Sequence, residues 1–274
     1  MAPDYQSLKS KTTDALRQVI RHGDYSRHTA GLGDGMLQAN VVIMPAIQAL
    51  DFMRFCQRNP KPCPLIAVSD TGNPIMSTAG KDIDIRTDVP AYYIYRGGLL
   101  SEEVTDVSDL WTDDMVAFAL GCSFTFEHAL LAAGIDVWHI TNNTTVPMYK
   151  TAIPTVPAGP FSGSLVVSMR MIPKDRVEEA KAITRKFPLA HGAPVHVGDP
   201  AEIGISDLSK PDWGDPAPEL DNHVPVFWAC GVTPQASIQN AKLPICITHK
   251  PGHMLVTDIP NDAEVPIINL PNSK

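Results

Sequence analysis

The segment at residues 224–248 constrains the fold most, because strand and helix signals follow one another there without a gap. It begins with the apolar run VPVFWAC and ends with PICIT, and both patterns are typical of buried strands. Between them, Thr233 precedes Pro234 as a helix cap precedes a proline in the first helical turn. The segment therefore predicts a strand, a helix that extends to about Ala241, and a second strand.

This order favours a right-handed parallel crossover, which would place both strands in one sheet. Residues 230–233 and 248–253 would then be neighbours, in the crevice where open α/β sheets bind ligands. We therefore expect one ligand site that contains Gly231, Thr233, His249 and His253.

Strand and helix signals alternate along most of the remaining chain. Strands are predicted at residues 38–44, 65–68, 91–96, 137–140, 164–172 and 193–197. Helices are predicted at residues 7–22, 45–58, 109–120, 124–133 and 173–186. The alternation predicts an α/β fold, with a layered and mostly parallel sheet that carries helices on both faces.

The composition changes after residue 141, where a stretch rich in Pro, Thr and Gly leads into a strand, a helix and another strand. Such a unit has an apolar face of its own, which is enough for a smaller α+β subdomain. We expect this subdomain to be an insertion at residues 142–215. Residues 1–141 and 216–274 would form the discontinuous main domain.

Charge and cysteine usage narrow the class of protein. The 274 residues include 22 Lys+Arg and 30 Asp+Glu, so the net charge is −8, and no basic run is present that would bind nucleic acid. The chain also contains neither a secretory signal nor an apolar run of about 18 residues that could span a membrane. Five dispersed cysteines without a CxxC pair indicate neither a zinc ribbon nor a disulfide framework. We expect a cytoplasmic protein, as a homodimer or larger homo-oligomer on general grounds.

The motif GCSFTFE combines a thiol, a hydroxyl and a carboxylate at a helix start. Free amides at such a start can hold a carboxylate group, with Ser123 beside them. Cys122 there is a candidate nucleophile, although a buried cysteine is often an inert small hydrophobe. Glu127 is a candidate catalytic partner, or it only balances the helix dipole.

Arg170 stands in the otherwise apolar run SLVVSMRMI and therefore requires an anionic partner. That partner is either an internal carboxylate or a carboxylate of the substrate. Tyr149, in the preceding VPMYKT segment, is a second candidate for substrate binding. His249 and His253 flank a Pro-Gly turn, which rules out the helix that a His-x3-His metal pair would need. An acid–base role or a role in capping the turn remains for them.

Several motifs in this order resemble the D-glutamate cyclase family, whose members are also described as hydro-lyases. They are QANVVIMP, FCQRNPKPCPL, GCSFTFE, VPMYKT, AGPFSG, HGAPVH-x-GDP, WACGVTPQ and THKPGHMLVTD. The resemblance extends over about residues 10 to 260. It implies a lyase that cyclises D-glutamate to 5-oxo-D-proline and water.

That reaction requires a base for the ammonium group, donors for the tetrahedral oxyanion, an acid for the departing oxygen and a cation for the α-carboxylate. We expect Arg170 to bind the α-carboxylate and the amides near Ser123 or Gly231 to hold the oxyanion. His249 or His253 would be the acid or base, tuned by Glu127. No organic cofactor is needed, although a divalent ion could polarise the γ-carboxylate.

Two other functions fit the same residues. One is a hydro-lyase or amidohydrolase that acts on a related small amino acid or cyclic amide. The other is a non-catalytic module that binds glutamate or 5-oxoproline.

Overall fold

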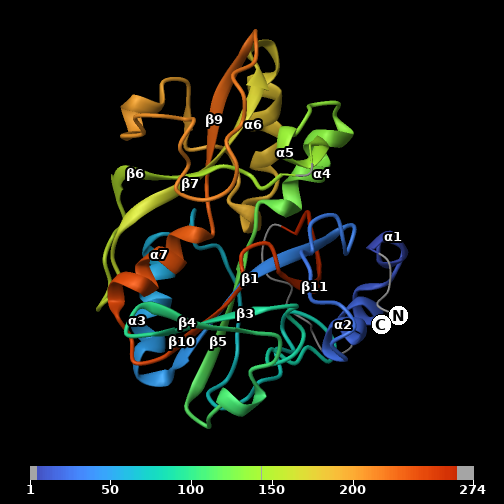
Figure 1. The fold of residues 1–274 in the computed structure, drawn as a ribbon, viewed down its shortest axis with the longest axis vertical. Helices are drawn as coiled ribbons and strands as arrows, with labels where there is room; N and C mark the ends of the chain where they lie inside the picture. Colours follow the sequence, from blue (N-terminus) through green and yellow to red (C-terminus); the bar gives the residue numbers. More distant parts are fainter. Residues whose placement is uncertain (1–4, 143, 264–274) are drawn as a thin grey trace.

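The computed structural model describes residues 5–142 and 144–263, which form two β-sheets, one above the other in Figure 1. The larger sheet lies in the lower half and pairs its strands in the order β2-β5-β1-β10-β3-β4, with β11 on the remaining length of β1. The bounds of these strands are β1 Met36–Pro45, β2 Leu65–Val68, β3 Tyr92–Arg96, β4 Leu99–Val104, β5 Met115–Gly121, β10 Cys246–His249 and β11 Leu255–Pro260.

The smaller sheet lies in the upper half and has the order β6-β7-β9-β8. Its strands are β6 Met148–Pro154, β7 Ser164–Pro173, β8 His196–Val197 and β9 His223–Ala229. Three of them come from residues 142–215, and β9 comes from the chain beyond that range.

The α/β class is confirmed, but the mostly parallel sheet is wrong, because the described strand pairs are antiparallel. The expectation rested on continuous apolar runs, which are typical of parallel strands covered on both faces. Here the central antiparallel strand β1 is also buried on both faces. The polar/apolar alternation that usually marks an antiparallel strand is therefore absent.

Different elements cover the two faces of the larger sheet. Helices α3 (Ala46–Arg58) and α7 (Val232–Ala241) pack on one face, against the side chains of Val42 and Met44. The other face carries Val41 and Ile43 and is covered by the long segment 76–89, which contains no regular element. The predicted helices at 45–58 and after Gly231 are thus confirmed.

Three further helices lie in the upper half beside the smaller sheet: α4 Phe124–Ala132, α5 Trp138–Thr141 and α6 Val177–Arg185. Two predictions in this region are wrong. Residues 115–120, the second half of the predicted helix at 109–120, form strand β5 instead, because the run MVAFAL is fully buried between β2 and β1 of the larger sheet. Residues 137–140 form the start of helix α5 instead of a strand. Short 3₁₀ turns complete the described chain: η1 Ser108–Leu110, η2 Lys174–Arg176, η3 Pro188–Ala190 and η4 Pro200–Ile203.

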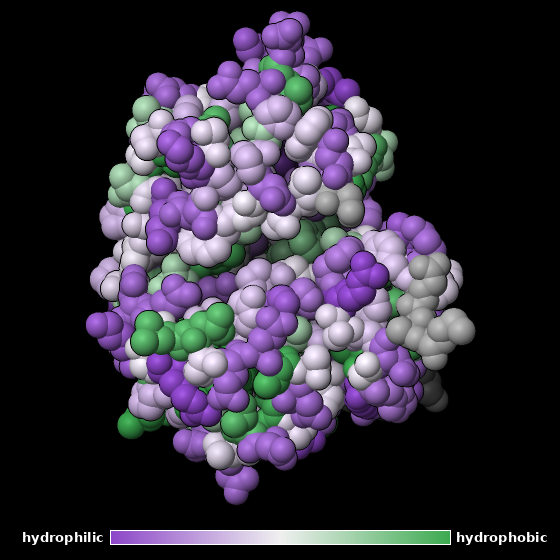
Figure 2. Space-filling view, in the orientation of Figure 1, coloured by the Kyte–Doolittle hydropathy of each residue, from purple (hydrophilic) through white to green (hydrophobic). Residues whose placement is uncertain are grey.

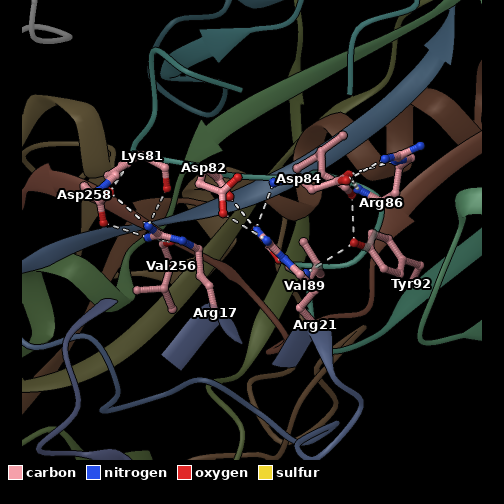
Figure 3. A network of polar contacts seen from close by, with 12 residues as sticks. Arg17, Arg21, Lys81, Asp82, Asp84, Arg86, Val89, Tyr92, Val256 and Asp258 are labelled. Atoms are coloured by element: carbon pink, nitrogen blue, oxygen red, sulfur yellow. Dashed lines mark hydrogen bonds and ion pairs between the residues drawn. The ribbon is translucent and has the colours of Figure 1, made fainter. Parts of the chain in front are cut away.

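The predicted N-terminal helix is divided into α1 (Tyr5–Leu8) and α2 (Thr13–Arg21), because Thr12 caps α2. Two arginines of α2 attach it to the rest of the molecule (Figure 3). Arg17 donates to both carboxylate oxygens of Asp258 in β11, and Arg21 donates to Asp82 and Asp88. None of the helices in residues 5–142 and 144–263 combines the length and apolar character needed to cross a membrane.

The predicted parallel crossover is wrong as well, since β9 belongs to the smaller sheet and β10 to the larger one. Helix α7 nevertheless joins them directly. The chain therefore passes from the upper half to the lower half at residues 229–231, and this crossing is one border of the candidate site.

Candidate active site

Two crossings of the chain meet at the centre of the molecule. Strand β5 of the larger sheet continues through residues 121–123 into α4, beside the smaller sheet. Strand β9 of the smaller sheet continues through residues 229–231 into α7, on the larger sheet. Both helices begin at the level between the sheets in Figure 1, and Figure 2 shows a groove there in the same orientation. The positive ends of two helix dipoles are thus directed toward one region.

Each crossing carries a cysteine next to the helix cap. Ser123 is the N-cap of α4 and Gly231 is the N-cap of α7, and in the described chain neither N-cap residue caps its helix with a side-chain hydrogen bond. Cys122 and Cys230 lie close enough to influence one another electrostatically. Burial raises the pKa of Cys122 to about 12 and that of Cys230 to about 11, although a helix amide bonds to each sulfur. Both groups are therefore neutral thiols near pH 7.

Arg170 of β7 lies next to these helix starts, and only 2% of its surface is exposed. Its Nη2 donates to Ser123 Oγ (3.2 Å) and to Glu127 Oε1, and its Nη1 donates to Ser168 Oγ (2.9 Å). The guanidinium lies 5.1 Å from the ring centre of Phe126 and 5.3 Å from that of Trp228. Of the two partners left open by the sequence, the structure contains the internal carboxylate.

Glu127 is also in contact with a residue that the sequence analysis did not select. His139 Nε2 lies 3.0 Å from the same Oε1 that accepts from Arg170. Burial alone would raise the pKa of Glu127, but the nearby His139 and Arg170 outweigh it and lower the pKa to about 2. Glu127 is therefore a carboxylate at any physiological pH. Its role in the structure is to neutralise Arg170.

Asn40 of β1 connects the two crossings. Its Nδ2 donates to the carbonyl oxygens of Leu120 (3.3 Å) and Gly121 (2.8 Å). A Cβ atom on Gly231 would lie only 2.4 Å from that same nitrogen, so only glycine fits there without a shift of Asn40. Gly121 is enclosed even more tightly, because its Cβ would lie 1.5 Å from the carbonyl oxygen of Leu189.

His249 lies on the other side of β1, at the end of β10. Its Nδ1 accepts from the Val41 amide at 3.1 Å, a shorter contact than the one with the Val41 carbonyl at 3.3 Å. Gln235 of α7 approaches the same nitrogen at 3.5 Å. The contact between α7 and His249 is thus made by Gln235, whereas the sequence placed residues 230–233 beside His249. Burial lowers the pKa of His249 to about 4, so its imidazole is neutral.

His253 lies in the turn between β10 and β11 and is only partly buried. Its Nδ1 lies 3.0 Å from the carbonyl oxygen of Pro251, which can only accept, so Nδ1 carries the proton. Burial, with the charge of Lys250 and the neighbouring His28, lowers the pKa of His253 despite the bond to Pro251. The basic nitrogen of this neutral imidazole is therefore Nε2.

Two of the predicted residues have other contacts. Tyr149 packs with Met169 on the face of the smaller sheet opposite to Arg170, and it donates to the carbonyl of Leu208 at 2.8 Å. Thr233 does not cap α7. Its Oγ1 accepts from the Val166 amide at 3.0 Å and so attaches the helix to β7. The structure does not bring Tyr149 to the helix starts.

No group of three or more His, Cys, Asp or Glu side chains in the described ranges is arranged to hold a metal ion. A shallow hollow lies beside the first turn of α4. Its lining includes Phe124, Thr125, His128 and Gln38.

Sequence reasoning missed His139, Asn40 and Gln235. His139 lies in VWHI, for which the sequence predicts a strand. A strand at that place gave no reason to expect His139 beside Glu127. Asn40 interrupts the apolar run QANVVIMP as Arg170 interrupts SLVVSMRMI, and the same argument about buried polar groups would have found it.

Comparison with known proteins gives close matches. A protein named "Putative hydro-lyase" from Dinoroseobacter shibae is 69% identical over 96% of this chain and 88% of its own length. One from Ruegeria pomeroyi is 62% identical over 100% of both chains, and one from Bacillus licheniformis is 53% identical over 90% of this chain and 94% of its own. Among solved structures, a nitrogen repressor-like protein, MJ0159 from Methanococcus jannaschii, covers 86% of this chain and 91% of that one, with 10% identity and a TM-score of 0.39. That likeness is too low to support an argument.

These relatives place the chain among proteins named as hydro-lyases. The family model described as D-glutamate cyclase matches residues 116–258, which include both crossings, Arg170 and both candidate histidines. The chain belongs to the D-glutamate cyclase family, as its motifs predicted.

Proposed function

We propose that this protein is a lyase that cyclises D-glutamate to 5-oxo-D-proline. The amine nitrogen attacks the γ-carboxyl carbon, a C–N bond forms, a C–O bond breaks and water leaves. The observation that carries the proposal is the meeting of two helix starts, whose N-cap residues make no side-chain cap bond, beside the buried Arg170. Membership in the D-glutamate cyclase family supports the choice of substrate.

The two helix starts suit a substrate with two carboxylates. The amides of Phe124 and Val232 already bond to the sulfurs of Cys122 and Cys230. The amide of each N-cap residue, Ser123 or Gly231, would therefore hold one carboxylate, and the two helix dipoles favour the negative charge. Binding both ends of glutamate would bring the amine close to the γ-carbon, and effective molarities for such ring closures can reach ~10⁵ M or more. The amides at one start would then stabilise the tetrahedral oxyanion.

Ser123 is the side chain best suited to contact a substrate carboxylate. Because its Oγ accepts from Arg170, its hydroxyl hydrogen is available for another acceptor. Arg170 itself already binds Glu127 and Ser168. Arg170 would therefore act on the carboxylate through Ser123, instead of forming the direct pair that the sequence suggested.

The hydrogen bonds of the two histidines assign them different tasks. Since Nδ1 of His253 carries the proton, its Nε2 would remove a proton from the substrate ammonium. Since Nδ1 of His249 accepts from the Val41 amide, its Nε2–H would donate a hydrogen bond to the departing oxygen without losing its proton. The protons removed from the substrate nitrogen through His253 would complete the water that leaves. Cys122, a neutral thiol, would line the site and not act as a nucleophile.

Incubation of the purified protein with D-glutamate, followed by chiral chromatography of both species, tests the proposal. We expect 5-oxo-D-proline to accumulate as D-glutamate disappears. Binding of unchanged D-glutamate would instead favour a binding module. Turnover of a cyclic amide or another amino acid, without turnover of D-glutamate, would favour a different hydro-lyase or an amidohydrolase.

The first variant for this assay is His253→Ala, which removes the proposed base. We expect kcat to fall about 100-fold or more with a small change in KM, because general-base catalysis contributes ~10²–10⁴-fold. His223→Ala is the matched control, since His223 Nδ1 also contacts a carbonyl two residues earlier, that of Asp221, at 2.7 Å. Equal rates for both variants and the wild type would remove His253 from the mechanism.

A further inference from the structure

We propose that His139 is a positioning residue of this active site, which orients Ser123 through Glu127 and Arg170. The inference rests on the proposed function. Its basis is one shared atom: Glu127 Oε1 is an ion-pair partner of both His139 Nε2, at 3.0 Å but outside hydrogen-bond geometry, and Arg170 Nη2. The two contacts reach Glu127 from different elements, α5 and β7.

The three side chains form a closed, nearly dry group. The exposed fractions are 7% for His139, 4% for Glu127 and 1% for Arg170. A carboxylate in such surroundings depends on the donors around it, since water cannot replace them. The position of Glu127 is therefore set by where His139 and Arg170 lie.

Arg170 transmits that position to the helix start. Its guanidinium lies close to the rings of Phe126 and Trp228, which restrict its movement. Its Nη2 is shared between Glu127 and Ser123. A shift of Glu127 thus changes the bond to Ser123, and with it the direction in which the Ser123 hydroxyl points.

The test compares two amides at position 139, with kcat and KM measured separately. A glutamine places its amide nitrogen near the position of His139 Nε2, whereas an asparagine is too short to reach Glu127. We expect His139→Gln to keep kcat/KM within about threefold of wild type. His139→Asn should lower it about tenfold or more, mainly through KM, because misplaced binding groups cost ~10- to 100-fold.

His191→Gln is the matched control. His191 is also buried and lies near Arg170, but its Nδ1 contacts the carbonyl of Lys61 at 2.8 Å instead of a carboxylate. We expect this variant to retain the wild-type KM. A KM increase equal to that of His139→Asn would mean that any lost buried imidazole disturbs the site, which would overturn the inference.

The Glu127→Gln background separates positioning from a direct role. If His139 acts only through Glu127, His139→Asn should lower kcat/KM less than twofold in that background. A full tenfold loss there contradicts the proposal. Thermal unfolding of each variant confirms that the compared proteins are folded.

Failure of this inference is distinguishable from failure of the proposed function. A wild-type protein that neither converts D-glutamate nor binds glutarate, the dicarboxylate probe, in a calorimeter contradicts the proposed function. An active wild type with equally active His139→Asn and His139→Gln variants contradicts the positioning role alone.

Discussion

At the scale of single residues, the buried charge of Arg170 decides how the site is built. The sequence required an anionic partner for Arg170. The structure supplies Glu127 from helix α4, and His139 lies against the same carboxylate oxygen. Both motifs were visible in the sequence as MR and GCSFTFE. Their pairing was not, because 42 residues separate Glu127 from Arg170 and only the tertiary fold brings them together.

Arg170→Ala should therefore lower the free energy of unfolding, and this loss of stability should be its main effect, ahead of any loss of substrate binding. Removal of the guanidinium leaves Glu127 as an uncompensated buried charge, which typically costs ~3–5 kcal/mol. Urea unfolding at pH 7 should measure that loss, and Arg170→Ala with Glu127→Gln should recover part of it. A single variant as stable as the wild type would mean that the ion pair contributes nothing to folding.

Ser123→Ala tests the contact proposed for the substrate. It removes the hydroxyl but leaves the helix amides, so we expect KM for D-glutamate to rise about tenfold with kcat changed less. The expected size corresponds to one hydrogen bond to a charged group, ~1.5–3 kcal/mol at most. An unchanged KM would exclude Ser123 as a carboxylate ligand.

At the scale of elements, the site exists because β5 and β9 each continue through a cysteine into a helix beside the opposite sheet. The sequence predicts the helix start after GCS correctly, but it places the second start at a Thr233 cap, two residues after the Gly231 cap that the structure shows. Strand β5 was mistaken for a helix, since Met, Ala and Leu favour helices and only its central place in the sheet decides otherwise. Local sequence thus located strand β9 and the start of α4, but neither strand β5 nor the first residue of α7.

Gly231→Ala tests the close approach of the two crossings. The new Cβ would lie 2.4 Å from Asn40 Nδ2, so we expect a loss of ~1–3 kcal/mol of stability and lower activity. Asn40→Ala should relieve the clash, so the double variant should be more stable than the sum of the two single effects. Strictly additive unfolding free energies would contradict the contact.

At the scale of the whole molecule, two antiparallel sheets replace the single mostly parallel sheet that the sequence suggested. The strands at 38–44, 65–68, 91–96, 164–172 and 224–230 were located correctly, but their directions were not. Direction depends on pairing between distant segments, such as β1 with β10, and a strand buried on both faces carries no sign of it. The contact of α7 with His249 is made by Gln235, and it arises because α7 joins the two sheets and not from the predicted parallel crossover.

The buried histidines make the stability of the whole molecule depend on pH. Burial lowers the pKa of His191 and of His249 from 6.5 to about 4, so the unfolded chain binds more protons than the folded one between those values. Stability should thus be fully present above pH 6.5 and fall as the pH approaches 4, by up to about 3 kcal/mol for each histidine. Urea unfolding across this range should show that loss, and His191→Gln should lessen it. A flat profile would contradict neutral histidines in the folded protein.

The central claim is that carboxylates bind where helices α4 and α7 begin. A crystal structure of the protein with 5-oxo-D-proline tests it most directly. The predicted result is a ligand whose carboxylate contacts Ser123 and the amides next to Cys122 or Gly231. A ligand held elsewhere, for instance in the hollow between Gln38 and His128 with both helix starts untouched, would contradict the account.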